Sequence, residues 1–512
     1  MRFSELVDVS RSVAETSGRL EKIDRLASLL NRLEPEEIEI AVAFLSGSPR
    51  QGRIGVGGSV VRTAHDAEPA ASATLTLSDV DAAFEQLASA SGPGSAAVRA
   101  QMLRDLFARA TRDEQDFLVR LIFGELRQGA LEGVLVEAVA RASGIAPARV
   151  RRAAMLAGAL APVARAALPA GNAGEDALSV FMIQLFQPVQ PMLADSAEDV
   201  GAALTELGEA SLEYKLDGAR IQVHKGGDEV RVFSRNLRDV SPAIPEVVKI
   251  VRTLPAREVI LDGEAIALRQ DGTPHPFQTT MRRFGRKLDV EALRAELPIT
   301  PAFFDLLYLD GQALVDEPLS RRTLAATGLV PARWLVPRLV TANADEAATF
   351  MARSIATGHE GVMAKALDGV YAAGRRGQAW LKVKRARTLD LVVLAAQWGH
   401  GRRRGTLSNL HLGARDPEHG GFVMLGKTFK GMTDEMLAWQ TKKLRELEIA
   451  RDEYAVFVRP ELVVEIAFND IQASPQYPGG VALRFARVKR YRTDKSPAEA
   501  DTIATVRSFL PK

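Results

Sequence analysis

Apolar side chains recur at helical spacing through the first third of the chain. Over residues 6–30, many of the leucine, isoleucine and valine positions share one helical face, such as Ile23, Leu26, Leu29 and Leu30, which is typical of amphipathic helices. Capping-box patterns at Ser78–Asp81 and Thr111–Glu114 predict two helix starts. The helix that follows Thr111 is expected to stop near Gly129. Further helices are predicted over 131–142 and 147–157.

A stretch rich in Gly, Ser and Ala separates these predicted helices. It runs from Ser46 to about Thr74 and is predicted to be a loop. No repeat period and no catalytic constellation stand out in this part of the chain. We therefore expect an all-α N-terminal domain over residues 1–185, with a role in interactions.

The pattern changes near Pro188 and Pro191, beyond which apolar and polar residues alternate with a period of two. This period predicts β-strands, and Gly226-Gly227-Asp228 is predicted to be a hairpin turn between two of them. An α+β core is therefore expected over residues 186–388. Its predicted strands cover 212–215, 221–224, 230–233, 259–261, 303–309, 361–365 and 380–384.

From about Leu389 onward the predicted strands are shorter and alternate with Gly-rich turns. Strands are expected at 391–394, 422–425 and 462–466, with one helix over 433–447. Short strands plus one helix in a segment of this size favour a small β-barrel, of which the OB-fold is the commonest kind. The third predicted domain therefore spans residues 389–512.

The composition is that of an ordinary globular protein, with 46% hydrophobic and 25% charged residues among 512. No apolar run approaches the roughly 20 residues of a membrane span, and the N-terminus lacks a signal-peptide core. A cytoplasmic protein without a membrane partner is expected. Cysteine is absent and only seven histidines occur, so a bound metal would be a hard cation held by carboxylates, phosphates and water.

Local charge is more informative than the net charge of +2. Basic residues cluster at three places, and clusters of this kind suit a partner rich in phosphate. The alternative is that each cluster is solvated surface charge. The clusters are Arg149, Arg151 and Arg152; Arg402, Arg403 and Arg404; and Arg484, Arg487, Lys489, Arg490 and Arg492.

A single lysine, Lys215, lies just before an Asp-Gly turn and between Glu213 and Arg220. A lysine ammonium is not nucleophilic, but neighbouring cations and partial burial favour the neutral amine. Lys215 is therefore a candidate for attack on a phosphorus or carbonyl centre. An isolated K-x-D-G is more often a solvent-exposed lysine at a strand end. The other residues of the core therefore decide whether Lys215 is interpreted as a nucleophile.

The remaining core supplies the parts of a phosphate-transfer site. Candidate cations are Arg220, Arg235, Lys365, Lys382 and Lys384, and candidate carboxylates at strand ends are Glu213, Glu264 and Glu360. Phe304 offers an aromatic face, and stacking on a base contributes roughly 1–3 kcal/mol. Each residue also has an ordinary structural alternative: Phe304 as core, the glutamates as ion-pair partners and the lysines at sheet edges.

Taken in order, these segments resemble the covalent nucleotidyltransferase superfamily and, within it, the ATP-dependent DNA ligases. Ala486 stands where the family usually has proline. The resemblance covers 186–512, and the N-terminal part is similar to the DNA-binding domain of eukaryotic and archaeal replicative ligases. The matching motifs are Lys215-Leu216-Asp217-Gly218 with Arg220, Ser234-Arg235-Asn236, Leu261-Asp262-Gly263-Glu264, Phe304-Asp305-Leu306-Leu307-Tyr308 followed by Glu317-Pro318-Leu319-Ser320-Arg321-Arg322, Glu360-Gly361-Val362-Met363-Ala364-Lys365, Trp380-Leu381-Lys382-Val383-Lys384, Arg484-Phe485-Ala486-Arg487 and Arg492-Thr493-Asp494-Lys495.

The resemblance implies a multidomain fold: an all-α DNA-binding domain, an ATP-grasp-like nucleotidyltransferase core and an OB-fold. It also implies a reaction in three steps. Lys215 attacks the α-phosphate of ATP and becomes lysyl-AMP, AMP moves to the 5′-phosphate of a DNA nick, and the 3′-hydroxyl then displaces AMP. The implied cofactor is Mg²⁺.

The resemblance also implies roles for individual residues. Glu213 and Arg376 would contact the nucleotide, Arg235 and Glu264 the ribose, and Phe304 the adenine. Arg220, Lys382 and Lys384 would neutralise the phosphate and favour the amine form of Lys215. Glu264 and Glu360 would lie at the metal, while Arg492, Asp494 and Lys495 would orient the pyrophosphate after the barrel swings inward.

The implied partners are ATP and nicked double-stranded DNA, bound by a monomer associated with the nucleoid; nothing in the sequence supports a sliding-clamp contact. An RNA ligase or a capping guanylyltransferase would share the lysine motif, but neither explains the helical N-terminus together with the C-terminal Arg-x-Asp-Lys. An NAD-dependent ligase is disfavoured because that family carries a four-cysteine zinc module. A non-catalytic DNA clamp with a decayed core is a further alternative.

Overall fold

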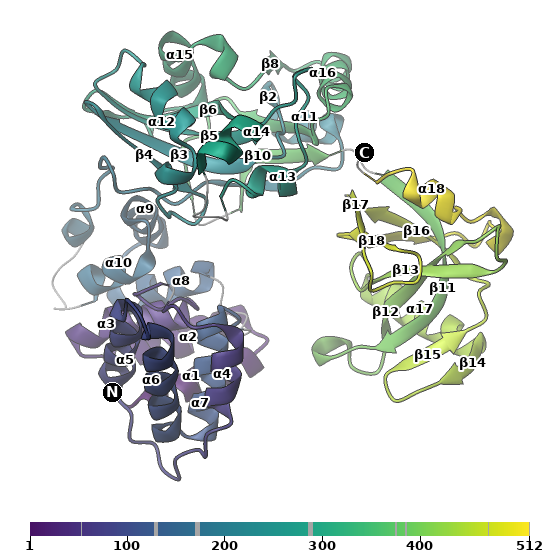
Figure 1. Cartoon of the computed structure of the whole chain (residues 1–512), viewed down its shortest axis with the longest axis horizontal. Coiled ribbons are helices and arrows are strands. Elements are labelled where there is room, and N and C mark those ends of the chain that lie inside the picture. The colour runs from purple at the N-terminus through teal and green to yellow at the C-terminus, as the bar shows by residue number, and fades with distance from the viewer. Residues whose placement is uncertain are drawn as a thin grey trace. The chain divides into compact units, whose positions relative to one another are not determined.

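The computed structural model describes residues 1–52, 54–126, 132–168, 175–284, 290–373, 376–384, 387–468 and 470–510, apart from the side chains of 175, 290–292, 376–378 and 402. The chain forms two compact units, residues 1–383 and 384–512. In Figure 1 the first unit comprises the purple and blue helices and the teal core, and the second is green to yellow. The division into three domains at 185 and 388 stays a prediction.

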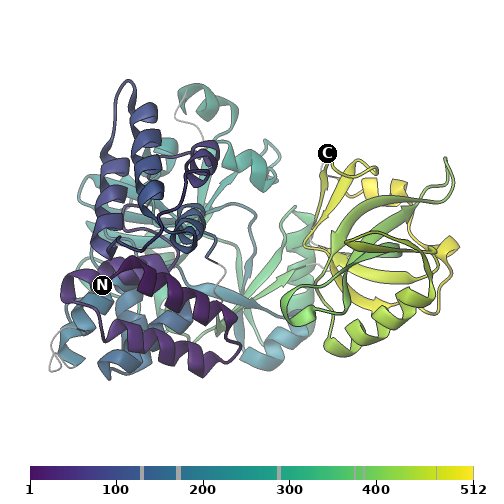
Figure 2. The same ribbon diagram turned by 90° about the horizontal axis from the view of Figure 1, so that it is seen from below.

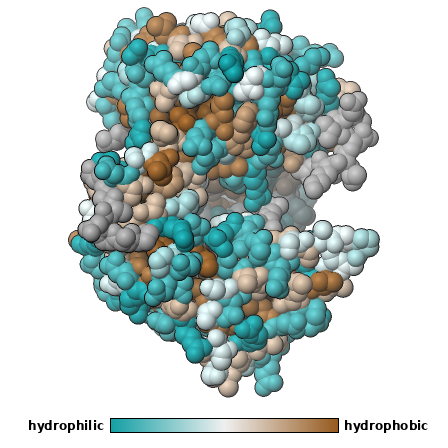
Figure 3. Space-filling model, turned by 90° about the vertical axis from the view of Figure 1, so that its left-hand side faces the viewer, coloured by the Kyte–Doolittle hydropathy of each residue, from teal (hydrophilic) through white to brown (hydrophobic). Residues whose placement is uncertain are grey.

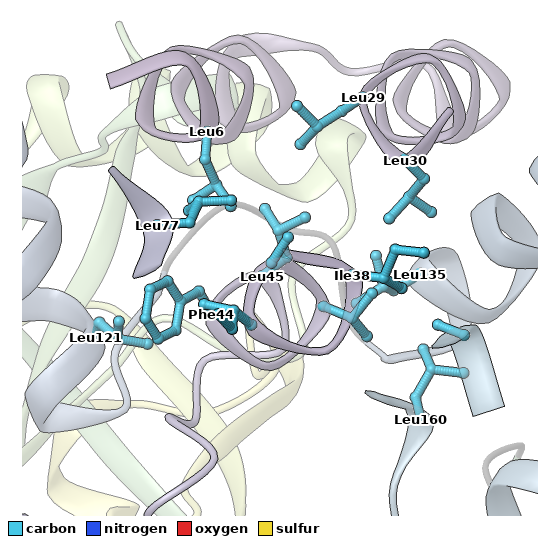
Figure 4. Packing of buried hydrophobic residues seen from close by; sticks show 14 of the residues in the cluster. Leu6, Leu29, Leu30, Ile38, Phe44, Leu45, Leu77, Leu121, Leu135 and Leu160 are labelled. Carbon is cyan, nitrogen blue, oxygen red and sulfur yellow. The ribbon is translucent and has the colours of Figure 1, made fainter. Parts of the chain in front are cut away.

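The N-terminal region is helical, as the apolar spacing predicted. Phe44 and Phe117 each pack edge to face on Phe3, with ring centroids 6.2 and 5.6 Å from that of Phe3. Leucines from several helices, such as Leu6, Leu77 and Leu121, pack in the same cluster as Phe44 (Figure 4). The helices are α1 (Phe3–Glu15), α2 (Arg19–Leu30), α3 (Pro35–Leu45), α4 (Gly58–His65), α5 (Leu77–Ser89), α6 (Ser95–Arg109), α7 (Arg112–Phe123), α8 (Glu132–Ser143), α9 (Pro147–Ala157) and α10 (Leu160–Ala167).

Three predictions of helix boundaries need correction. The predicted 46–74 loop contains α4, whose Val61 and Ala64 are buried in the core. The capping box of α5 is formed by Thr76 and Asp79, so Ser78 lies inside the helix. Helix α7 has the predicted Thr111 box but ends at Phe123, because Gly124 adopts the left-handed conformation (φ 68°) that commonly ends helices; Gly129 lies outside the described residues.

Two sheets form the core that follows the helical region within the first unit. In the described residues, one sheet has the strand order β1-β10-β9-β2-β8 and the other β4-β3-β5-β6-β7. The strands are β1 (Leu193–Ser196), β2 (Ala210–Tyr214), β3 (Ala219–Gly226), β4 (Glu229–Ser234), β5 (Glu258–Ala267), β6 (Ile299–Leu309), β7 (Gln312–Ala313), β8 (Arg338–Thr341), β9 (Gly361–Ala366) and β10 (Arg376–Lys384). The helices are α11 (Val200–Leu207), α12 (Pro245–Arg252), α13 (Phe277–Met281), α14 (Val290–Glu296), α15 (Leu319–Leu329) and α16 (Ala344–Ala356).

Each sheet buries one face under helices. Val200 and Leu204 of α11 and Phe350 of α16 pack on the sheet that contains β2. On the other sheet, apolar residues of β3 and β5 such as Ile221 and Leu261 pack together with α12 and α15. A third group of buried residues, which includes Ile260 of β5 and Trp380 of β10, joins the remaining faces. The two sheets therefore face each other through this third group.

The alternation along β3 and β5 places polar residues on the face opposite α12. Arg220 pairs across the ladder with Glu264, and Gln222 pairs with Asp262. Because side chains alternate between faces with a period of two, these four share one face. Strand β5 runs ten residues to Ala267, so the prediction that Glu264 lies at a strand end is wrong.

The second unit is rich in strands. Its curved sheet follows the order β13-β12-β11-β15-β14, with β16 paired to β11 and β19, and α17 confirms the predicted helix (Figure 2). Among the strands that the structure describes, this sheet does not close into a barrel. The elements are β11 (Arg387–Trp398), β12 (Leu407–Arg415), β13 (Phe422–Thr428), α17 (Asp434–Glu446), β14 (Glu448–Arg451), β15 (Ala455–Val458), β16 (Val463–Phe468), β17 (Asp470–Ala473), β18 (Val481–Arg484), β19 (Arg487–Tyr491) and α18 (Ile503–Arg507).

Hydrophilic residues cover much of the face shown in Figure 3, with smaller groups of apolar residues between them. In the described part of the chain, no helix is both long enough and apolar enough to cross a membrane.

Candidate active site

Lys215 follows directly after β2 and lies beside the residue that precedes β9. The amide of Lys215 donates to the carbonyl of Gly361 at 2.8 Å, and the amide of Glu360 donates to the carbonyl of Lys215 at 3.1 Å. The side chains of Lys215 and Glu360 form an ion pair, and about a fifth to a quarter of each is exposed (20% and 27%). The candidate nucleophile is therefore accessible and has a carboxylate as its ion-pair partner.

The Asp-Gly turn after Lys215 approaches β5 too closely for any residue except glycine. A Cβ atom at Gly218 would lie 2.4 Å from a methyl carbon of Ile266 and 2.5 Å from the carbonyl oxygen of Ala265. The turn also receives a hydrogen bond of 3.3 Å from the amide of Phe277 to the Asp217 carboxylate. Gly218 thus allows the lysine segment to pack on the strand that carries Glu264.

Glu264 has a strongly perturbed acidity. Burial raises the pKa of Glu264 to about 8; Arg220 and Lys215 act in the opposite direction, and Asp262 and Asp217 add to the increase. Desolvation has this effect because it penalises the charged carboxylate. Glu264 therefore carries a proton near neutral pH and can donate a hydrogen bond.

Replacing Glu264 with Gln should change the pH dependence of folding stability. The pKa of Glu264 rises from about 4.5 to about 8 on folding. The bound proton of Glu264 therefore adds to the free energy of unfolding. This contribution is fully present below about pH 4.5 and is lost as the pH rises to about 8. The melting temperature of Glu264→Gln minus that of the wild type should therefore rise by at least about 2–4 °C between about pH 5 and 8 and then level off. Calorimetry measures this difference, and a constant difference would contradict the raised pKa.

Arg220 is held rigidly on the polar face of β3. Its Nε and Nη2 atoms donate to the two carboxylate oxygens of Asp262 at 3.0 and 2.6 Å. The Nη1 atom donates to the carbonyl of Met192 at 2.5 Å. The guanidinium carbon lies 5.5 Å from the centroid of the Phe304 ring and 5.6 Å from that of Trp380. Asp262 offsets much of the charge of Arg220, and the predicted effect of Arg220 on Lys215 stays a prediction.

Phe304 belongs to a cluster of rings and buried charges. Its ring meets Trp380 edge to face at 5.9 Å, and the Lys365 ammonium lies 4.4 Å from its centroid. Lys365 pairs with Glu213 at 2.6 Å, and Arg338 pairs with the other oxygen of Glu213 at 2.7 Å. Burial lowers the pKa of Lys365, and Glu213 opposes this effect. Phe304 is only partly buried and keeps an accessible surface.

The Glu213 carboxylate is almost inaccessible, with 2% of its side chain exposed. Both of its oxygens bind cations of the core. Arg338 also donates to the carbonyl of Phe304 at 3.2 Å. Glu213 therefore holds the two cations, Lys365 and Arg338, that contact Phe304. The predicted contact of Glu213 with the nucleotide stays a prediction.

Four other predicted residues occupy different environments. Lys382 lies on β10 and donates to the carbonyl of Ala194 at 3.4 Å, and Lys384 ends the same strand. Arg235 lies in an exposed turn after β4. Arg376 begins β10, but its side chain is outside the described residues. Among the described residues, interactions link Lys215 with Glu360 and with Glu264, Glu264 with Arg220, and Arg220 with Phe304.

The predicted pyrophosphate residues lie in the second unit and bind one another there. Arg492 pairs with Asp390 at 3.1 Å and with Asp494 at 2.7 Å, and Lys495 pairs with Asp390 at 2.5 Å. The Asp494 carboxylate has its pKa lowered to about 2 by the hydrogen bond from Arg492. These cations therefore have carboxylate partners within their own unit.

The residues present fit a hard cation only in part. Among the described residues, no group of three or more His, Asp or Glu side chains is arranged to hold a metal ion. Glu264 and Glu360 would supply two oxygen-bearing groups, and Mg²⁺ commonly takes one or two carboxylates together with phosphate oxygens and water. A divalent cation would thus depend on the nucleotide for its remaining ligands.

Sequence reasoning missed several residues that hold the site together. Arg338 and Tyr371 lie in segments without a strong periodic pattern, so nothing local identified them. Asp262 stands in a motif that the sequence identified, but its role was not predicted, although it shares the alternating face of Glu264 on β5. The Asp305–Arg322 pair, with both side chains fully buried and 2.7 Å apart, could have been suspected from two charges within a mostly apolar motif.

Comparisons with known proteins identify a family for three successive segments of the chain. The family description "ATP dependent DNA ligase domain" matches residues 191–384, "ATP dependent DNA ligase C terminal region" matches 403–495, and "DNA ligase N terminus" matches 57–140. A solved structure named Pmar-Lig_Pre covers 95% of this chain and 99% of its own, with a TM-score of 0.61 and 18% identity. At that identity the structure supports the fold alone.

Curated relatives extend over the whole length of the chain. A "Probable DNA ligase" of Anaeromyxobacter sp. (strain Fw109-5) is 62% identical over 511 residues, which are 99% of this chain and 98% of the relative. A "Probable DNA ligase" of Mycobacterium marinum is 53% identical over an alignment of 514 positions, which covers 99% of this chain and 100% of the relative. With such relatives along its full length and matching descriptions in three successive segments, this chain belongs to the ATP-dependent DNA ligase family.

Proposed function

We propose that this protein seals nicks between a 5′-phosphate and a 3′-hydroxyl in duplex DNA with ATP, and that Lys215 carries the AMP. The observation that carries the proposal is an accessible Lys215 that pairs with Glu360 and interacts with Glu264, the residue opposite Arg220 on the polar face of β3 and β5. The relatives named above, full-length DNA ligases by name, support the same activity.

The first step is attack by the Lys215 amine on the α-phosphorus of ATP. A nitrogen–phosphorus bond forms, the bond from the α-phosphorus to the bridging oxygen breaks, and pyrophosphate leaves with that oxygen. The amine must lose a proton, and Glu360, already paired with Lys215, is positioned to accept it. The 5′-phosphate of DNA then takes the AMP from Lys215, and the 3′-hydroxyl finally displaces AMP to form the phosphodiester bond.

The other core residues bind and orient the nucleotide in this proposal. The accessible face of Phe304 stacks on adenine, and protonated Glu264 donates a hydrogen bond to the ribose, with Arg235 nearby. Arg220, Lys382 and Lys384 stabilise charge on the phosphate, and Arg376 contacts the nucleotide. Mg²⁺ would be held by Glu360, and by Glu264 only where Glu264 is ionised; the ion would supply further positive charge at the phosphates.

We propose that the second unit is an OB-type domain and binds DNA through an exposed aromatic patch. Phe429 and Phe485 are each 56% exposed. The Lys430 ammonium lies 5.9 and 5.6 Å from their ring centroids, and the Arg484 guanidinium lies 5.6 Å from Phe485. Aromatic faces with adjacent cations suit bases and phosphates together. The helical residues 1–185 form the other DNA-binding domain, next to an ATP-grasp-like core over 186–388.

Incubation with nucleotide labelled at the α-phosphate tests the proposed function. The full-length protein should form a covalent AMP adduct with ATP, not with GTP or NAD, and should transfer the label to a nicked DNA duplex. Labelling by GTP would instead favour a capping guanylyltransferase. Transfer of the label to nicked RNA but not to nicked DNA would favour an RNA ligase. Absence of any adduct would favour a non-catalytic DNA-binding protein.

A further inference from the structure

A buried tyrosine lies behind Arg220 in the first unit. Tyr371 belongs to the segment between β9 and β10 and is 2% exposed. Its hydroxyl donates to Asp262 at 2.7 Å and accepts from the Nη2 of Arg220 at 3.2 Å and from the amide of Met192 at 3.1 Å. A phenol has one donor and two acceptor lone pairs, so this hydroxyl has all of its hydrogen-bonding capacity in use.

The same network leaves Arg220 little freedom. A guanidinium has five N–H donors, and Arg220 directs two to Asp262, one to Tyr371 and one to the carbonyl of Met192. One N–H, on Nη1, remains for a ligand. Removing the Tyr371 hydroxyl would free the second hydrogen of Nη2 and leave the Met192 amide without this acceptor. The direction in which Arg220 presents its charge therefore depends on Tyr371.

The segment that carries Tyr371 is itself well anchored. The Tyr371 amide donates to the carbonyl of Val315 at 2.8 Å, and buried Arg322 donates to the carbonyl of Gly369 at 3.0 Å. The Tyr371 ring meets Trp380 edge to face at 6.1 Å. Because Trp380 also contacts Phe304, the segment connects Arg220 with the aromatic cluster of the site.

We propose that Tyr371 is a positioning residue for adenylyl transfer: its hydroxyl holds Arg220 and Asp262 in the orientation in which Arg220 meets the α-phosphate. The proposal rests on the proposed function of the site, specifically on the role of Arg220. Burial, together with the Asp262 carboxylate, raises the pKa of Tyr371 well above its ordinary value. The hydroxyl thus remains a donor to Asp262 throughout the working pH range.

Single-turnover formation of the AMP adduct by full-length Tyr371→Phe tests this role. We expect the rate at saturating ATP to fall about tenfold, the effect of losing one hydrogen bond to a charged group, with a smaller change in the ATP concentration for half-maximal rate. Tyr308→Phe is the matched control. It also removes one tyrosine hydroxyl from the core, which donates to Glu258 at 3.1 Å, and it should keep the wild-type rate. An unchanged rate in Tyr371→Phe would overturn the proposal.

A double-mutant cycle separates positioning of Arg220 from a general loss of packing. If Tyr371 acts through Arg220, adding Tyr371→Phe to Arg220→Lys should slow adduct formation by less than twofold beyond Arg220→Lys alone. If the double variant instead slows adduct formation by the product of the two single-variant factors, the proposal is overturned, because Tyr371 would then act independently of Arg220. Failure of the wild type to form any adduct would instead refute the proposed function, so the two failures are distinguishable.

Discussion

Lys215→Ala should form no AMP adduct and should not seal an ordinary nick with a 5′-phosphate. The variant lacks the nitrogen that attacks the α-phosphorus, and removal of a nucleophile typically lowers the rate by roughly 10⁴-fold or more. Nicked DNA that already carries AMP on its 5′-phosphate bypasses the lysine, so the variant should still seal it. Gel analysis of labelled protein and of both DNA substrates measures these outcomes.

Two further variants make the Lys215 result specific. Lys215→Arg keeps a positive charge beside Glu360 and should preserve the fold while losing the adduct. Lys249→Ala removes an exposed lysine of α12 and should label as the wild type does. Persistence of the adduct in Lys215→Ala would refute the role of Lys215, and failure to seal the adenylylated nick would show that Lys215 is also needed after AMP transfer.

Phe485→Gly should bind nicked DNA about five- to 150-fold more weakly than the wild type and yet fold no less stably. Loss of one stacking contact weakens the binding free energy by roughly 1–3 kcal/mol, and about 1.4 kcal/mol corresponds to a tenfold change in the dissociation constant. Phe485 has a φ of +56°, a conformation that costs a bulky residue roughly 1–3 kcal/mol. Glycine adopts this conformation without the steric cost. Fluorescence anisotropy and calorimetry measure affinity and melting temperature.

Phe485→Ala separates the two effects of this substitution. Alanine removes the ring but keeps a Cβ at positive φ, so its melting temperature should lie a few degrees below that of Phe485→Gly, while the two variants bind DNA equally weakly. Tyr454→Ala, which removes another exposed ring of the same unit (65% exposed), should leave DNA affinity unchanged. Wild-type affinity in Phe485→Gly would contradict the proposed DNA contact.

Much of the fold was predictable because local patterns decide it. Helices α8 and α9 and the hairpin at Gly227 lie where periodicity and turn residues predicted them. Predictions of boundaries were less accurate. Helix α4 forms in a stretch rich in glycine because packing of Val61 and Ala64 outweighs weak helix propensity.

The candidate site was predictable only as a set of residue types. The motifs placed Lys215, Arg220, Glu264 and Phe304 in one core, and their order identified the family. The partners of these residues were not predictable, because Arg338 and Tyr371 are 125 and 151 residues from the side chains they bind. No local pattern reports on contacts across such separations.

The sequence by itself determined the helical and strand-rich segments, the lysine motif and the family, since these follow from short-range order along the chain. Only the tertiary structure decided which charges meet. It pairs Lys215 with Glu360, encloses Glu213 between Lys365 and Arg338, and raises the pKa of Glu264 by burial. The physical reason is that ion pairing and desolvation depend on distances in space, which strand pairing and the close approach at Gly218 set.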